Sequence, residues 1–262
     1  MIPEEMQSLK SWFLDYSNSF SLPAVEDQRN LALKQEHTRL VCLNSRRIAQ
    51  HLRLGREETL LAEAAALFHD VGRFPQYARY KTFDDRISLN HAVLGAQVLL
   101  ENNALGTLSK HDQGIILRSV TLHNVFSLPA TLDDETMLFA KLVRDADKLD
   151  ILRVFLEYFA MDPGSRAGAV VLGLPDEPGY SQEVLCCLRN GTMAKYSLLK
   201  TQNDFKLLQL TWMYDLNFTC SLRMVVEQDS INKLAKYLPR TDDITKAIEV
   251  VREYVNGRLQ DR

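Results

Sequence analysis

Turn-forming residues and cysteines are both scarce in this 262-residue sequence. Its 11 glycines and 8 prolines make up about 7% of the chain, where soluble proteins average about 12%. Because tight turns usually need one of these residues, their scarcity favours long helices over many short strands. The four cysteines include no C-x-x-C pair, which argues against both a disulfide framework and a cysteine zinc site.

Long apolar runs and an excess of positive charge are also absent. No stretch approaches about 18 uncharged apolar residues, so we expect no transmembrane helix. Acidic residues stand at Glu4 and Glu5, where a signal peptide would be basic, so we expect a cytoplasmic protein. The 31 Lys and Arg against 34 Asp and Glu make neither a nucleic-acid duplex nor a membrane an expected partner. We therefore expect the partner to be a small-molecule substrate. The chain could also assemble into a homo-oligomer.

Apolar residues recur at helical spacing through most of the chain. The segments with this spacing are approximately 28–53, 56–72, 88–103, 112–124, 134–160, 182–199, 204–237 with a break, and 242–259. Ser88 is a candidate N-cap for one of them, and Thr241, Asp242 and Asp243 are candidates for the last. Residues 161–181 hold four of the glycines and three of the prolines, which indicates a long loop. Inside this loop, only the apolar run 170–174 is compatible with a short strand.

The predicted class is therefore all-α. We expect one compact domain. In it, the C-terminal helices of residues 182–262, which follow the 161–181 loop in the sequence, pack on a helical core of residues 1–160. This organisation would leave the loop as the main irregular segment of the fold.

All six histidines fall within the first 123 residues, and four of them are predicted to face the core. His37 and His69 each continue an apolar stripe of a helix, and His123 closes another. His91 opens a segment in which Gly95, one turn later on the same face, allows another element to approach closely. One buried histidine is usually an ordinary hydrogen-bonded core residue. Four on different helices indicate a shared centre instead.

Aspartates accompany these histidines at two places in the chain. Asp70 directly follows His69 at the end of a strongly apolar helix, which Gly72 is expected to end. A carboxylate in such surroundings must be paired, for example with Arg73, or must coordinate a cation.

A second set of aspartates lies in the helix over 134–160. Asp145 and Asp147 each share an apolar stripe, so periodicity does not choose between them. Asp150 aligns with charged residues on a polar face, and we expect it to be solvated. The inward histidines and aspartates together form a nitrogen and oxygen donor set that suits one or two Mn, Fe, Co, Ni, Zn or Mg ions.

The order H…HD…H…H…D resembles the HD superfamily of all-α metal-dependent phosphohydrolases over approximately residues 30–160. The runs FHDVGRF and DADKLD carry the resemblance most specifically, and they select Asp147 over Asp145 as the last aspartate. The pair His111-Asp112 is a decoy among turn-forming residues. No G-Y-P follows His123, so the HD-GYP activity on cyclic dinucleotides is not expected.

The resemblance also implies a metal-ligand set. One ion would be held by His37, His69, Asp70 and Asp147. The remaining pair, His91 and His123, matches the added histidines of binuclear members, in which the aspartate of the His-Asp pair bridges both ions.

The implied activity is hydrolysis of a small phosphate ester, with a nucleotide expected, by a metal-activated water. His69, Asp70 and Arg73 would then be the catalytic residues, and Arg73 with Lys81 would bind the substrate phosphate. Two alternatives remain open. One is a mixed-valent di-iron oxygenase, because some members of the superfamily with the same six ligands use iron and dioxygen. The other is a nucleotide-sensing module without catalysis.

Overall fold

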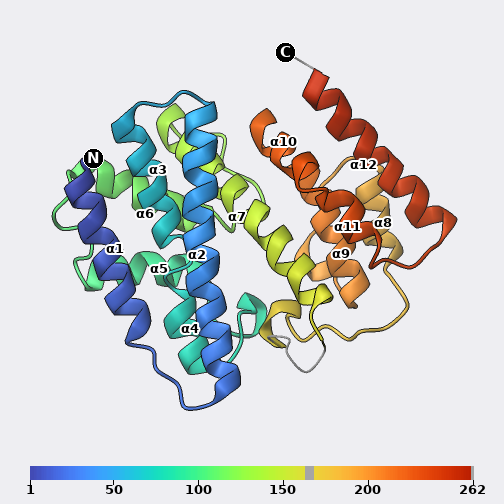
Figure 1. Ribbon diagram of the computed structural model, residues 1–262, viewed down its shortest axis with the longest axis horizontal. Coiled ribbons are helices and arrows are strands. Elements are labelled where there is room, and N and C mark those ends of the chain that lie inside the picture. The colour runs from blue at the N-terminus through green and yellow to red at the C-terminus, as the bar shows by residue number, and fades with distance from the viewer. Residues whose placement is uncertain (163–167, 261–262) are drawn as a thin grey trace. The chain divides into compact units, whose positions relative to one another are not determined.

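The chain is helical throughout the part that the structure describes (Figure 1). A computed structural model describes residues 1–162 and 168–260. Every regular element in these residues is an α-helix or a short 3-10 helix, which confirms the predicted all-α class. None of the helices in these two ranges combines the length and the apolar character needed to cross a membrane.

Two compact units make up the chain, and the boundary between them falls inside one long helix. The first unit consists mainly of residues 1–150, and the second mainly of residues 151–162 and 170–260. The packing of all helices into a single domain stays a prediction.

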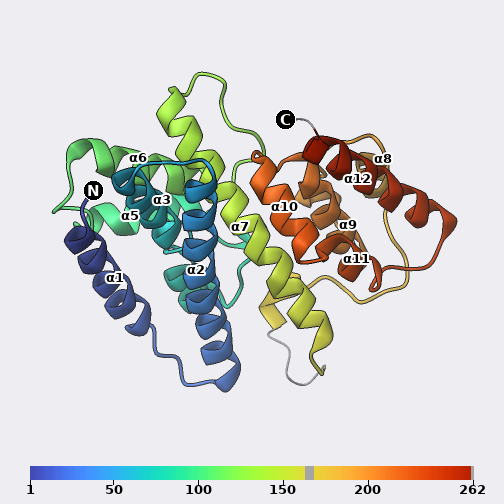
Figure 2. The same ribbon diagram turned by 45° about the horizontal axis from the view of Figure 1, so that its top comes forward.

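The first unit contains seven α-helices and one 3-10 helix in the described residues, the last α-helix only as far as Asp150. They are α1 (Pro3–Asn18), α2 (Val25–His51), α3 (Arg56–Phe68), α4 (Arg73–Tyr80), η1 (Asp85–Ile87), α5 (His91–Glu101), α6 (Lys110–Leu122) and α7 (Asp134–Ala160). Helix α3 lies at the centre, because α1, α2 and α6 all pack against it, and α5 packs against α6 (Figures 1 and 2).

The sequence of α3 explains its central place. Its N-terminus is capped by Glu58, whose side chain accepts a hydrogen bond from the Gly55 backbone N–H at 2.7 Å. Four alanines follow, all with 0% exposure: Ala62, Ala64, Ala65 and Ala66. Alanine has the highest helix propensity and the smallest side chain that still favours a helix, so neighbouring helices can approach α3 from several sides.

The junction after α3 differs from the prediction. The helix ends at Phe68 rather than at Gly72, and Gly72 has an ordinary helical φ of −69° at the start of α4. Glycine is required there for space, because a Cβ on Gly72 would lie 2.2 Å from the His91 carbonyl oxygen and 2.6 Å from the Gly95 nitrogen. The close approach predicted at Gly95 is therefore made by the start of α4.

The cap of α5 also corrects the prediction. Asn90 is the N-cap residue, and its side chain accepts hydrogen bonds from the backbone N–H groups of Ala92 and Val93. Ser88 instead donates its hydroxyl to the Asp84 carbonyl oxygen at 2.7 Å. The correct cap lies immediately before His91, so Asn90 helps to fix where that histidine begins its helix.

Two of the α-helices that the structure describes, α1 and α4, lie outside the predicted ranges. The signal for α1 was present, because its buried Met6, Leu9 and Phe13 follow helical spacing. Helix α4 has only eight residues, too few to show a repeating apolar stripe.

The second unit contains the end of α7 and a set of shorter helices. Its further helices are α8 (Gln182–Arg189), η4 (Tyr196–Leu198), α9 (Gln202–Thr211), η5 (Trp212–Tyr214), α10 (Thr219–Glu227), α11 (Ser230–Ala235) and α12 (Asp242–Gln260). Helix α8 packs between α9 and α12, and α10 packs against α12. The predicted cap Thr241 accepts a hydrogen bond from the Ile244 N–H at 3.2 Å, at the start of α12.

The strand considered at 170–174 does not form. A 3-10 helix, η3 (Gly168–Val171), occupies its first residues. Leu172 and Gly173 then adopt positive φ angles of 52° and 69°, which no extended strand can contain. Residues 163–167 of the predicted 161–181 loop lie outside the described residues.

Candidate metal centre

Six side chains from five helices and helix ends meet inside the first unit. His69 and Asp70 lie between α3 and α4, and the helix ends supply further members of the group. The complete set is His37 on α2, His69 and Asp70, His91 at the start of α5, His123 directly after α6, and Asp147 on α7. All four histidines and Asp70 are buried, with exposed fractions of 5% or less.

Asp70 lies at the centre of this group. Its Oδ2 is 3.6 Å from Nε2 of both His37 and His69. Its Oδ1 is 3.3 Å from Nε2 of His91 and 3.8 Å from Nε2 of His123. Each carboxylate oxygen thus faces its own pair of imidazoles, and within each trio the candidate donor atoms lie within 4.8 Å of one another.

Asp147 joins one of these two trios. Its Oδ1 lies 3.1 Å from Nε2 of His37 and 3.5 Å from Nε2 of His69. We call His37, His69, Asp147 and Asp70 Oδ2 the first half-site. Asp145, the alternative that periodicity left open, is fully buried, whereas the Asp147 side chain is 15% exposed. Burial therefore does not favour Asp147, but the distances place it beside the histidines.

The second half-site consists of His91, His123 and Asp70 Oδ1. It has one carboxylate fewer than the first half-site. Asp70 is the only residue that belongs to both half-sites, so ions bound in the two half-sites would share this carboxylate.

The outer nitrogen of every histidine in the group is already occupied. Each Nδ1 lies 2.6–2.7 Å from an acceptor: His37 from Asp150 Oδ2, His69 from the Ala66 carbonyl oxygen, His91 from Asp85 Oδ2, and His123 from the Val120 carbonyl oxygen. A carbonyl or carboxylate oxygen can only accept, so each Nδ1 carries the proton. In a neutral imidazole, Nε2 then presents a lone pair toward the centre.

These lone pairs face each other at short distances. Nε2 of His37 and of His69 are 3.2 Å apart, and Nε2 of His91 and of His123 are 2.9 Å apart. Burial and the charge of Arg73 lower the pKa of His91, and burial with the neighbouring histidines lowers the pKa of His123 to about 3. Two neutral imidazoles with converging lone pairs repel unless a cation lies between them. The donor set therefore fits a divalent metal ion.

The first half-site has a different charge balance. Burial and Lys34 oppose protonation of His37, but its hydrogen bonds with Asp147 and Asp150 raise its pKa overall. The pKa of Asp147 is held well below its ordinary value, because His37 and His69 in their protonated form donate to its carboxylate and outweigh the effect of burial. Carboxylate and imidazole are thus closely coupled here before any metal binds.

Two cations flank Asp70, one on each oxygen. Lys34 Nζ lies 2.7 Å from Oδ2, and Arg73 Nε lies 3.3 Å from Oδ1. Burial alone would raise the pKa of Asp70, but the surrounding positive charge, Lys34 foremost, holds it well below its ordinary value. Pairing with Arg73 was among the expectations for Asp70. Sequence reasoning missed Lys34, although it precedes His37 by one helical turn.

Asp150 corrects a sequence prediction. The expectation of a solvated residue fails, because Asp150 is 2% exposed and its Oδ2 lies 2.7 Å from His37 Nδ1. The polar stripe continues only beyond it, where Arg153 and Glu157 form an ion pair. The usable signal was the spacing of three residues from Asp147, which puts both carboxylates on one face of α7.

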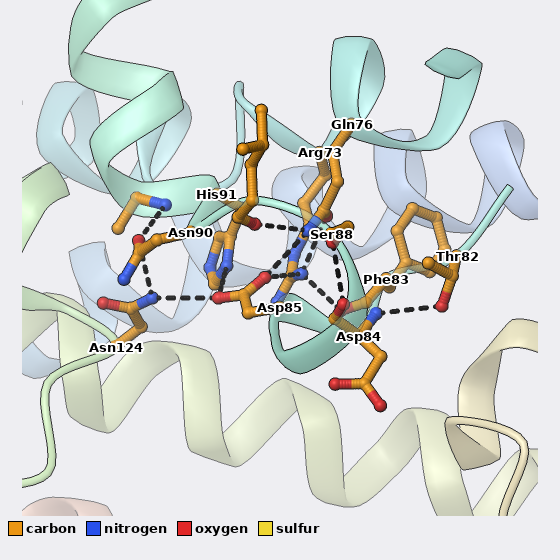
Figure 3. Close-up of polar contacts among 12 residues, drawn as sticks. Arg73, Gln76, Thr82, Phe83, Asp84, Asp85, Ser88, Asn90, His91 and Asn124 are labelled. Atoms are coloured by element: carbon orange, nitrogen blue, oxygen red, sulfur yellow. Dashed lines mark hydrogen bonds and ion pairs between the residues drawn. The ribbon is translucent and has the colours of Figure 1, made fainter. Parts of the chain in front are cut away.

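Arg73 is tied down by the segment that follows α4. Its Nη1 donates to the Phe83 carbonyl oxygen at 2.6 Å and to Asp85 Oδ1 at 2.9 Å. Figure 3 shows Asp85 between Arg73 on one side and His91 with Asn124 on the other. A side chain that the sequence did not single out, Asp85, therefore connects a predicted catalytic residue to a predicted ligand.

The remaining candidates lie at the surface. Lys81 forms an ion pair with Asp27 at 2.5 Å, and its side chain is 48% exposed. The predicted decoy His111 is 59% exposed and pairs with Glu135 and Asp112. The histidines of the two His-Asp dipeptides thus have opposite surroundings.

Comparison with known proteins identifies one family. Residues 35–152 match the model of the HD domain, and this range includes all six residues of the two half-sites. Searches among curated proteins and among solved structures gave no match to this chain. HD domains are all-α domains that bind divalent metals, which agrees with both the fold and the donor set described above. Residues 35–152 therefore form an HD domain, the domain of the metal-dependent phosphohydrolase superfamily.

Proposed function

We propose that this protein hydrolyses a small phosphate ester, with a nucleotide as the expected substrate, using divalent ions held by the two half-sites. The observation that carries the proposal is the position of Asp70, whose two oxygens each face a separate pair of histidines. One carboxylate placed in this way can bridge two ions, and a pair of bridged ions is a common arrangement for phosphate ester hydrolysis.

The ligands are prepared before an ion arrives. Hydrogen bonds at Nδ1 hold the four imidazoles in one tautomer, with Nε2 directed to the centre. Divalent ions bound there supply a water of lowered pKa and offset negative charge on the phosphate. Asp70 and Asp147 are both ionised at neutral pH, because their pKa values lie well below the ordinary value.

Positive charge for the substrate is available on both sides of Asp70. The Lys34 side chain is 16% exposed and lies over the Phe83 ring, with Nζ 5.1 Å from the ring centre. We assign Lys34 as a phosphate-binding cation, a role in which a flexible ammonium acts as a point charge. Arg73 adds charge on the other side, although its contacts with Asp85 hold it in place. Lys81 is paired with Asp27, so we expect it to contribute less to phosphate binding.

The test is a phosphate-release screen with a matched pair of variants. Protein purified without chelators is assayed with nucleoside mono-, di- and triphosphates and cyclic nucleotides, in the presence of Mn²⁺, Co²⁺, Ni²⁺, Mg²⁺ or Zn²⁺. We expect turnover of at least one class, with loss of turnover in Asp70→Ala. The control is Asp112→Ala, which removes the aspartate of the other His-Asp pair, outside both half-sites, and should keep full activity.

Other outcomes would replace the proposal. Turnover retained in Asp70→Ala, with helicity unchanged by circular dichroism, would remove Asp70 from catalysis. Tight iron retention with oxygen consumption and no phosphate release would favour the di-iron oxygenase. Nucleotide binding in calorimetry without product under any metal would favour the sensing module.

A further inference from the structure

The two half-sites use the same device to orient their histidines. In each, one imidazole donates its Nδ1–H to a backbone carbonyl three residues earlier, as His69 does to Ala66 and His123 to Val120. In each, the other imidazole lies against an aspartate that belongs to neither half-site. Such outer carboxylates fix the ring and raise its basicity as a ligand. The two half-sites therefore differ in the aspartate that holds this second imidazole.

Asp150, the outer carboxylate of the first half-site, is part of a rigid element. It lies on α7, one turn after Asp147, and is 2% exposed. The histidine that it orients, His37, lies in the middle of α2. Both partners are therefore held within long helices.

Asp85, the outer carboxylate of the second half-site, lies on a three-residue 3-10 helix within segment 82–90. Its side chain is 28% exposed. The segment is held to the unit by side-chain contacts (Figure 3): Gln76 donates to Asp85 Oδ1 and to the Leu89 carbonyl oxygen, and Asn124 donates to Asp85 Oδ2. Asp85 thus reaches His91 from a short connecting segment rather than from a helix of the core.

Asp85 also reaches the shared carboxylate indirectly. Arg73 Nη1 donates to Asp85 Oδ1 at 2.9 Å, and Arg73 Nε donates to Asp70 Oδ1 at 3.3 Å. This is the oxygen that faces His91 and His123, whereas Lys34 contacts the opposite oxygen. Two of the three groups of the second half-site are therefore supported through Asp85.

We propose that Asp85, carried by segment 82–90, sets the metal occupancy of the second half-site. The first half-site, with one more carboxylate and supports on long helices, fills first. The second half-site holds the weaker, exchangeable ion, and its affinity depends on the hydrogen bond between Asp85 and His91. Asp85 is a positioning residue, and the inference rests on the two-ion form of the proposed function.

The test is a calorimetric titration of the metal-free full-length protein with Mn²⁺, in which no substrate is needed. We expect two binding steps for the unaltered protein. Asp85→Ala should weaken the second step about 10- to 100-fold, which is the usual effect of removing an outer partner of a ligand, and leave the first step unchanged. Asp85→Asn keeps an oxygen that can accept the His91 Nδ1–H, so it should restore part of the second step.

Two further variants make the test selective. Asp150→Ala should weaken the first step, because it removes the corresponding support of His37. Asp27→Ala removes an aspartate of the same unit that accepts from Tyr77 and Lys81 outside the half-sites, so both steps should persist. Circular dichroism and thermal unfolding of each variant confirm that it folds.

Three results would overturn the inference. Equal weakening of both steps in Asp85→Ala would mean that Asp85 supports the fold rather than one half-site. An unchanged second step would remove Asp85 from metal binding. A single step in the unaltered protein would leave one ion, in which case hydrolysis by a one-metal centre could still be found in the phosphate-release screen.

Discussion

Two ligands of the first half-site lie within the two longest helices that the structure describes, whereas both histidines of the second half-site lie at helix ends. Helices α2 and α7 each have 27 residues, and they carry His37 and Asp147 of the first half-site. His91 and His123 of the second lie at the start of α5 and just beyond α6. The difference teaches that two similar donor sets within one cluster can depend on separate parts of the fold, and so can be changed one at a time.

The largest expected effect comes from separating α4 and α5, on which the second half-site depends. In Gly72→Ala, the new Cβ would overlap the His91 carbonyl oxygen and the Gly95 nitrogen, so one of the two helices must move. We expect a loss of about 3 kcal/mol in the free energy of unfolding, at the upper end for overpacking, together with loss of one Mn²⁺ equivalent. Urea unfolding and elemental analysis measure the two effects.

The matched control for this substitution is Gly257→Ala in α12. A Cβ there meets open space, and alanine is the better helix former, so stability should rise by roughly 0.5–1 kcal/mol. If Gly72→Ala proved as stable as the unaltered protein and kept its metal, the close packing of α4 and α5 would have no part in the second half-site.

A more selective change removes the second half-site without moving a helix. The double variant His91→Ala, His123→Ala deletes both imidazoles but keeps all ligands of the first half-site. We expect metal content to fall from near two equivalents to about one in protein purified without chelators. One equivalent in both proteins would make the two histidines ordinary buried residues and would support a centre with a single ion.

The smallest effect is a difference in pH dependence between the half-sites of the metal-free protein. The pKa values of His91 and His123 are lowered from 6.5, that of His123 to about 3, so the unfolded chain takes up these protons first as the pH falls. Their contribution to stability is complete above pH 6.5 and is lost toward about pH 3. The pKa of His37 is raised, so its contribution has the opposite sign and is lost as the pH rises.

Urea unfolding between pH 5 and pH 7 measures this difference, in a range where ordinary aspartates are mostly ionised. Each lowered histidine adds a slope of up to about 1.4 kcal/mol per pH unit. The unaltered protein should therefore lose more stability on acidification than the His91→Ala, His123→Ala variant. Equal slopes would show that these two histidines do not remain neutral in the folded protein.

Sequence reasoning succeeded where a residue could be compared with its own helix. His37, His69 and His123 each continue an apolar stripe, and all three are buried where that pattern placed them. The all-α class followed in the same way from helical spacing along the chain. Gathering the residues around Asp70 needed the family resemblance as well, because periodicity gives a direction for each side chain but no meeting point.

The misses have a common physical cause. Asp150 was assigned to a polar face, but α7 is buried on more than one side and His37 supplies its partner from α2. Asp85 lies in a segment without any period, and Lys34 reaches Asp70 through the tertiary fold. Polar pairs of this kind depend on how separate elements pack together. The periodicity of a single element does not contain this information.

Two helices end at the candidate metal centre with the same polarity. Helix α3 stops one residue before His69 and α6 one residue before His123, and each histidine is the C-cap of its helix. The carboxyl end of a helix carries about half a negative charge from its aligned peptide dipoles. Two such ends would add an attraction for cations that involves no side chain, and it would persist in any variant of the six donor residues that leaves α3 and α6 in place.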